Sequence, residues 1–137
     1  MPADLIDVLV AEHRRLESLF ADAETAPTPE RRRAALAVAL DALARHAAAE
    51  ERFLHPALRE WLPAGPEIVE YEQAEHDSIA RDAAGCRGGD VPAALFDAVR
   101  QHMQEEETEI FPRLSQACPP PRLLELGALL KSARVTE

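Results

Sequence analysis

The sequence predicts an all-α protein, built as an up-down-up-down four-helix bundle with a short C-terminal fifth helix. Alanine and leucine dominate the 137 residues, and aromatic residues make up only 4%, so residues that favour strands are scarce. Apolar residues recur at steps of three and four in four separate segments, as on one face of a helix. The connections between these segments are short, and short connections join antiparallel neighbours in helix bundles.

The first two helices are expected over about residues 4–23 and from residue 29 onward. Thr28 and Pro29 supply an N-cap and a first-turn proline for the second helix. Pro56 is expected to kink or end that helix, because it lacks an N–H group and restricts the residue before it. On each helix, one row of residues at steps of three and four is expected to face the core, and we call it the inward stripe. The stripe of the first helix is Ile6, Leu9, His13, Leu16 and Phe20, and that of the second is Ala39, Leu43, His46, Glu50 and Phe53.

Two further helices and a short terminal one follow. The third is expected over about residues 66–84, and a glycine-rich turn over residues 85–90 leads to the fourth, which Pro112 is expected to close. A leucine-rich segment predicts a fifth helix over about residues 120–134, lying across the end of the bundle. The stripes of the third and fourth helices are Val69, Glu72, His76, Ile79 and Ala83, and then Leu95, Val99, His102, Glu106 and Ile110.

Length and charge limit the functions that the chain can have. A chain of 137 residues has the length of one domain, so residues 1–137 are predicted to form a single domain. The net charge of −10 argues against a nucleic-acid partner, which needs a basic surface. The N-terminus resembles no signal peptide and no segment approaches about eighteen apolar residues, so no membrane association is expected and a cytoplasmic location is predicted. Cys86 and Cys118 are interpreted as free thiols, because their spacing matches no zinc or redox motif.

A repeated motif indicates the chemistry. His46 and Glu50 stand four positions apart, as do His102 and Glu106, and in each copy a second glutamate, a proline and a leucine follow at matching offsets. On an α-helix, residues i and i+4 lie on one face, about 6 Å apart along the axis. An imidazole and a carboxylate placed in this way can bind the same transition metal ion. Two such pairs facing each other in a bundle predict a two-metal site.

The repeat extends to the other two helices of the bundle. The triplet Ala-Glu-His ends at His13 in the first helix and at His76 in the third. Each half is therefore a helical hairpin with one lone histidine and one motif pair, which predicts a pseudo-twofold arrangement around a shared centre. The repeat breaks at one position, because Glu72 precedes His76 by four residues where the first helix has a leucine.

Seven ionisable residues occupy the inward stripes and are predicted to be metal ligands: His13, His46, Glu50, Glu72, His76, His102 and Glu106. A buried ionised glutamate costs several kcal/mol unless it is paired, and no Lys or Arg occupies those stripes. The alternative, a metal-free core in which each residue is satisfied separately, requires a coincidence at every one of these positions. Imidazole and carboxylate ligands without thiolate favour iron in a four-helix bundle, with manganese or zinc as substitutes.

The order of these residues resembles that of a known family, the hemerythrin-like HHE cation-binding domains. The pattern spans residues 4 to about 114 and is carried by His13, His46, Glu50, His76, His102 and Glu106. The resemblance implies two non-haem iron ions joined by an oxo or hydroxo bridge. It also implies that the first two histidines bind one iron, that the last two bind the other, and that the two glutamates bridge both.

Two positions depart from the oxygen-carrying hemerythrins. Glu72 stands where the carriers have a fifth histidine, and Glu106 stands where they have a differently spaced aspartate. We therefore predict that Glu72 is a third carboxylate ligand of the metal bound by His76 and His102, although it could instead accept a hydrogen bond or turn to solvent. A carboxylate at this position would favour the ferric state over reversible binding of dioxygen.

These features predict a di-iron protein that binds or reduces a small oxidant, such as dioxygen, nitric oxide or peroxide, for sensing, scavenging or storage. Two alternatives remain open: an iron sensor or store whose occupancy controls folding or a partner contact, and an enzyme with catalase-like or oxidase activity. The sequence identifies no protein partner. Near the site, Glu51 and Glu107 are interpreted as solvated residues that could alternatively accept hydrogen bonds from histidines, and His55 is expected to be peripheral.

Overall fold

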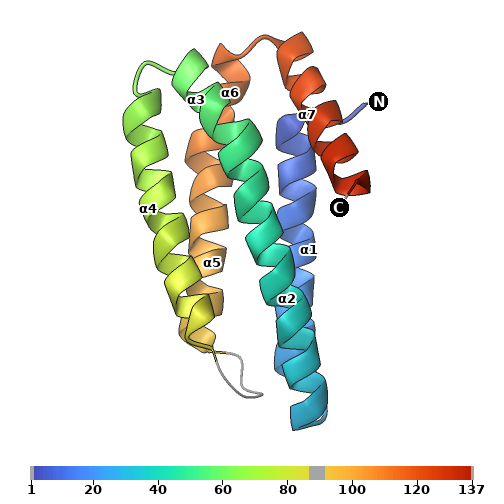
Figure 1. Ribbon diagram of the computed structural model, residues 1–137. Helices are drawn as coiled ribbons and strands as arrows, with labels where there is room; N and C mark the ends of the chain where they lie inside the picture. The colour runs from blue at the N-terminus through green and yellow to red at the C-terminus, as the bar shows by residue number, and fades with distance from the viewer. Residues whose placement is uncertain (1, 87–91, 137) are drawn as a thin grey trace.

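The computed structural model of the protein describes residues 2–86 and 92–136. The predicted all-α bundle is confirmed, with a fifth helix, α7 (Pro120–Val135), packed on its side (Figure 1). Of the predicted glycine-rich turn, residues 87–90 lie outside the described part of the chain. Among the described residues, no helix has both the length and the apolar character needed to cross a membrane. The four bundle helices are α1 (Leu5–Thr25), α2 (Pro29–Ala49), α4 (Gly65–Ala84) and α5 (Ala93–Glu105).

Side-chain caps fix where the first two helices begin. Asp4 accepts a hydrogen bond from the Asp7 N–H at 2.9 Å, and the Asp7 side chain accepts one from the Asp4 N–H at 3.0 Å. This reciprocal pair satisfies two of the N–H groups that a helix start leaves without partners. At the start of α2, the Thr28 hydroxyl accepts from the Arg31 N–H at 3.2 Å, as the sequence predicts.

Both helices that carry the repeated motif continue beyond their prolines. A five-residue π-helical turn begins at the glutamate of each motif, and a short α-helix follows it. After α2 come η1 (Glu50–Leu54) and α3 (His55–Trp61), and after α5 come η2 (Glu106–Ile110) and α6 (Phe111–Ala117). The expectation that Pro112 closes its helix is therefore wrong, and at Pro56, where a kink or an end was expected, the helix does not end.

The wide turns explain how the prolines are accommodated. In η1 the His55 N–H bonds to the carbonyl of Glu50, five residues back, and in η2 the Phe111 N–H bonds to that of Glu106. A proline has no N–H to donate, and its ring would clash with the carbonyl four residues earlier in a regular helix. A π-helical turn inserts one extra residue, which relieves the clash and changes the direction of the following side chains.

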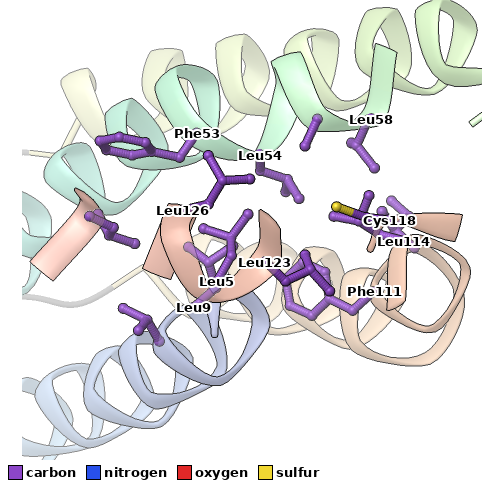
Figure 2. Packing of buried hydrophobic residues seen from close by; sticks show 14 of the residues in the cluster. Leu5, Leu9, Phe53, Leu54, Leu58, Phe111, Leu114, Cys118, Leu123 and Leu126 are labelled. Atoms are coloured by element: carbon purple, nitrogen blue, oxygen red, sulfur yellow. The ribbon is translucent and has the colours of Figure 1, made fainter. Parts of the chain in front are cut away.

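The apolar core consists of two clusters on either side of a layer of buried polar residues. One cluster joins α7 to the N-terminal half of α1, to the turns η1 and η2 and to the short helices (Figure 2). Cys118 lies in this cluster as a free thiol, as predicted. The second cluster lies toward the opposite end of the bundle and contains the stacked rings of Phe20 and Phe96, whose centroids are 5.0 Å apart. The inward residues between the two clusters are the histidines and glutamates of the four stripes.

The terminal helix α7 packs along α1 and does not lie across the end of the bundle as predicted. Gly127 lies against the backbone of Ala3 and Asp4, so closely that an added Cβ would sit 2.6 Å from the Ala3 carbonyl oxygen. Further along, Arg134 reaches Glu12 of α1, with its Nε 2.8 Å from Glu12 Oε2. The two helices therefore run side by side in the same direction, because glycine allows their backbones to approach.

Candidate metal centre

The structure brings all seven predicted ligand residues into one buried layer. Helices α1, α2, α4 and α5 and the turns η1 and η2 contribute them, and none is more than 7% exposed to solvent. The three glutamates have no exposed surface at all. The members of this layer are His13, His46, Glu50, Glu72, His76, His102 and Glu106.

Two groups of donor atoms within this layer could each hold a metal ion. In each group the donor atoms lie within 4.8 Å of one another. The first group contains His13 and His46, the second contains His76, His102 and Glu72, and both contain Glu50 and Glu106. This sharing of two carboxylates between two histidine pairs is the arrangement that a pair of bridged ions requires.

The two histidine pairs face the shared carboxylates through their Nε2 atoms. His13 Nε2 lies 3.1 Å from a Glu106 oxygen and His46 Nε2 lies 3.1 Å from a Glu50 oxygen. On the other side, His76 Nε2 lies 3.0 Å from Glu50 and His102 Nε2 lies 3.4 Å from Glu106. Glu72 is placed differently, because its oxygen lies 3.6 Å from the Nδ1 atom of His102.

Hydrogen bonding within the protein leaves many of these atoms unsatisfied. The buried Nε2 atoms of His13, His46 and His102 have no hydrogen-bond partner, nor do both oxygens of Glu72 and Glu106. Buried polar atoms without partners are rare and destabilising. Two atoms that bind one ion at about 2.1 Å lie about 3 Å apart when the two bonds are perpendicular. The separations observed here and the donor types therefore fit metal ions held between the histidines and glutamates.

Each of the four histidines also bonds to a carboxylate on its outer side. His13 Nδ1 donates to Glu107 at 2.7 Å, and His76 Nδ1 donates to Glu51 at 2.9 Å. Of the two interpretations given for Glu51 and Glu107, solvated residues or acceptors from histidines, the structure shows the second. The two glutamates follow Glu50 and Glu106 directly in the sequence, and from the partly exposed flank of the helix each reaches a histidine of a neighbouring helix.

The other two outer carboxylates were not recognised from the sequence. His46 Nδ1 donates to Glu12 at 2.8 Å, and His102 Nδ1 donates to Glu75 at 2.7 Å. The repeated Ala-Glu-His triplet could have revealed them, because it places a glutamate directly before the lone histidine in each half of the chain. A carboxylate that accepts from Nδ1 fixes the tautomer and orientation of the ring and leaves Nε2 free to bind metal. All four predicted histidine ligands have this support.

Three of the outer carboxylates are themselves held in place. Arg134 of α7 forms an ion pair with Glu12, Arg14 forms one with Glu107, and the Tyr71 hydroxyl donates to Glu75 at 2.9 Å. Burial opposes ionisation of Glu12, but His46 and Arg134 outweigh it and lower the pKa of Glu12 to about 2. Glu12 is therefore an ionised acceptor across the physiological range.

His55 is buried, with 1% of its surface exposed, and the expectation that it is peripheral is wrong. On a regular helix it would lie about 140° from Glu50, but the π-helical turn η1 brings residue i+5 above residue i. Its ring centroid lies 5.4 Å from that of His76. Phe111 is the equivalent residue in the other half, and its ring stacks on that of His13 with the centroids 5.7 Å apart. His55 therefore packs against a proposed ligand histidine as Phe111 does. Burial and the neighbouring His76 lower the pKa of His55 to about 4, which keeps it neutral.

Two of the buried carboxylates and a histidine show how charge is distributed in the layer. Burial and the charge of Glu50 raise the pKa of Glu106 well above its usual range. Burial also opposes ionisation of Glu50, but the charge of His46 and the close approach of the other histidines lower its pKa well below the usual range. For His102, burial disfavours the charged form, yet Glu106 and Glu50 raise its pKa to about 12. Without metal, the layer therefore holds protons that metal binding would displace.

Replacing Glu75 by alanine is expected to weaken metal binding by roughly 10–100-fold, the usual effect of losing a carboxylate that orients a ligand histidine. The cause is the free rotation and tautomer exchange of His102 once its Nδ1 partner is absent. Affinity is measured by competition with a chromophoric chelator. Glu70→Ala on the same helix is the matched control, because Glu70 is exposed. Equal affinities of the two variants would contradict an orienting role for Glu75.

Comparison with known proteins identifies the family of this arrangement. Residues 4–114 match the family model described as the hemerythrin HHE cation binding domain. The comparisons with curated proteins and with solved structures gave no match. The matched range covers most of the chain and includes every residue of the two donor groups. The chain therefore belongs to the hemerythrin HHE cation-binding domain family.

Proposed function

We propose that this protein holds two iron ions and binds or reduces a small oxidant, such as dioxygen, nitric oxide or peroxide, for sensing, scavenging or storage. The observation that carries the proposal is the pair of donor groups that share Glu50 and Glu106. In the proposal, His13 and His46 hold one ion, and His76 and His102 hold the other together with Glu72. The family assignment supports cation binding at these residues.

The donor chemistry supports iron as the metal. The groups contain imidazole and carboxylate but no thiolate, which disfavours Cu(I) and structural zinc. Carboxylates that bridge two ions inside a four-helix bundle are typical of di-iron and di-manganese proteins. Iron, when bound, supplies an electron donor and acceptor together with a coordination position for a small ligand. Manganese and zinc are expected to bind the same residues as substitutes.

The residues around the site have separate roles in this function. The outer carboxylates hold each histidine with Nε2 turned inward. The two apolar clusters above and below the layer limit the access of water, which strengthens the electrostatic interactions inside it. Glu72 brings a negative charge to one of the two ions, and this charge favours the ferric state over reversible binding of dioxygen.

A test of this proposal is the metal content after anaerobic reconstitution with ferrous iron. About two irons per chain are expected, as in other carboxylate-bridged bundles. Elemental analysis gives the content, and optical spectra under air, nitric oxide and peroxide then show which oxidant reacts. A content of one iron or none would refute the two-ion centre. Two irons without any spectral response would refute only the role in oxidant binding and would leave the two-ion centre standing.

The position of Glu72 provides a second test. Glu72→His is expected to slow autoxidation of the ferrous protein, because a neutral ligand stabilises the ferric state less than a carboxylate does. The rate is followed by optical spectroscopy under air. Glu70→His, an exposed substitution on the same helix, is the control. If both variants autoxidise at the wild-type rate, Glu72 does not act as a ligand.

The alternative of an iron sensor has one supporting observation. Arg134 of α7 bonds to Glu12, and Glu12 bonds to His46, so a continuous chain of contacts links the terminal helix to the centre. If occupancy is signalled through this chain, protease sensitivity of α7 should change between chelated and iron-loaded protein. It should not change in Arg134→Gln. Equal proteolysis of wild-type protein in the two states would leave oxidant binding as the better proposal.

A further inference from the structure

A cavity of about 160 Å³ lies between α2 and α4 and reaches the metal-site layer from one side. Its inner end is formed by four of the proposed ligands, His46, Glu50, His76 and His102. The three other proposed ligands do not line it. The cavity is therefore a compartment beside the proposed ions and not simply the space that the ions would occupy.

Small side chains on two facing helices create this cavity. Ala44 and Ala47 line it from α2, and Ala80 and Ala83 line it from α4. Residues three apart share a helix face, so each helix presents two methyl groups where larger side chains would close the gap. Ala44 and Ala80 are exposed and form the mouth, Ala47 and Ala83 are half-buried, and Leu16, Val99 and Met103 are buried.

The cavity walls are apolar up to the point where the ligand residues begin. Leu43, Ile79, Val99 and Met103 are among the wall residues, and the thioether of methionine is polarisable and adapts to different neighbours. Among the described residues, no lysine or arginine lines the cavity, and a charged group on a guest would lie mostly against apolar side chains. Burying an ion in such surroundings is strongly unfavourable. The walls therefore favour neutral guests.

The size of the cavity exceeds the needs of a diatomic ligand. A water molecule takes about 30 Å³ in the liquid, and a dry apolar cavity of about 150 Å³ in another protein binds benzene or xenon. We propose that this cavity binds a neutral apolar organic molecule of up to about the size of benzene, placed beside the metal centre on the side of His76 and His102. The functional meaning of this position rests on the proposed metal centre, but the binding itself does not require metal.

Fluorobenzene is a suitable probe, and its binding can be followed by ¹⁹F NMR. Saturable binding of one equivalent is expected in chelated and in iron-loaded wild-type protein. Ala47→Phe fills the cavity from α2 and Ala83→Phe fills it from α4, and each is expected to abolish saturable binding. The charged analogue 4-fluorobenzoate is expected to bind much more weakly, because most of the cavity wall is apolar and burying a carboxylate against it is unfavourable.

Matched controls separate filling of the cavity from general damage. Ala48→Phe and Ala84→Phe place the same side chain on exposed neighbours that do not line the cavity, and they should bind fluorobenzene like the wild type. Circular dichroism confirms folding of each variant, and binding lost in a folded filling variant supports the proposal. Absence of saturable binding in chelated wild-type protein, or equal binding in the filling variants, would overturn it. Failure of iron to bind would leave this test intact while refuting the proposed function.

Discussion

Alanine in place of Glu50 or Glu106 is expected to abolish the two-metal centre, with metal content falling from about two ions per chain to one or none. Both donor groups contain these two carboxylates, so each substitution removes a proposed ligand from both proposed ions at once. Both side chains are fully buried, so alanine leaves each position without a carboxylate inside the layer. Metal content after reconstitution and gel filtration measures the effect, and Glu109→Ala, on the exposed side of η2, is the control.

Glutamine variants separate the loss of metal from damage to the fold. Burial and Glu50 push Glu106 toward its protonated form, for which glutamine is a close substitute in shape. By contrast, Glu50 is held in its ionised form by the surrounding histidines, and glutamine removes that charge. In chelated protein, Glu106→Gln should therefore lower the free energy of unfolding less than Glu50→Gln does. Urea denaturation tests this order, and a larger loss for Glu106→Gln would contradict the assignment of charges.

Six of the seven residues of the layer could be predicted because two independent signals agree on them. Helical periodicity puts them on inward stripes, and the internal repeat puts His46 and His102, like His13 and His76, at equivalent places. Glu72 breaks the repeat but follows the periodicity, and it is buried in the same layer. Their roles as ligands remain predictions, because proximity and burial show only that the atoms could bind metal.

The outer carboxylates could not be predicted with the same security, because a helical period gives the angle of a residue but not what faces it. Glu12 and Glu75 lie on the flanks of their helices and are significant only because α2 and α5 bring His46 and His102 to them. His55 was misplaced for another reason. The π-helical turn changes the helix phase after Glu50, and a pattern based on 3.6 residues per turn, the regular value, cannot show this.

Removal of bound metal is expected to destabilise the fold strongly. An ion that binds only the native state adds about 4 kcal/mol when its free concentration is a thousand times Kd. For a domain of this size that corresponds to roughly 15 °C in melting temperature per ion. Zinc is a convenient redox-inert substitute for the comparison, and thermal melts followed by circular dichroism with and without chelator give the shift. Equal melting of the two samples would contradict a centre that is part of the core.

The stabilisation by metal is further expected to grow between about pH 6.5 and pH 9. Burial disfavours charge on His46, but Glu50 and Glu12 raise its pKa from 6.5 to about 9. In chelated protein the stability that this shift provides is complete below pH 6.5 and is lost as the pH rises through 9. The metal-bound form needs His46 without its Nε2 proton, so competition from protons decreases over the same interval. Both effects increase the difference in melting temperature between metal-bound and chelated protein as the pH rises. If this difference instead narrowed from pH 6.5 to pH 9, His46 would not bind the metal.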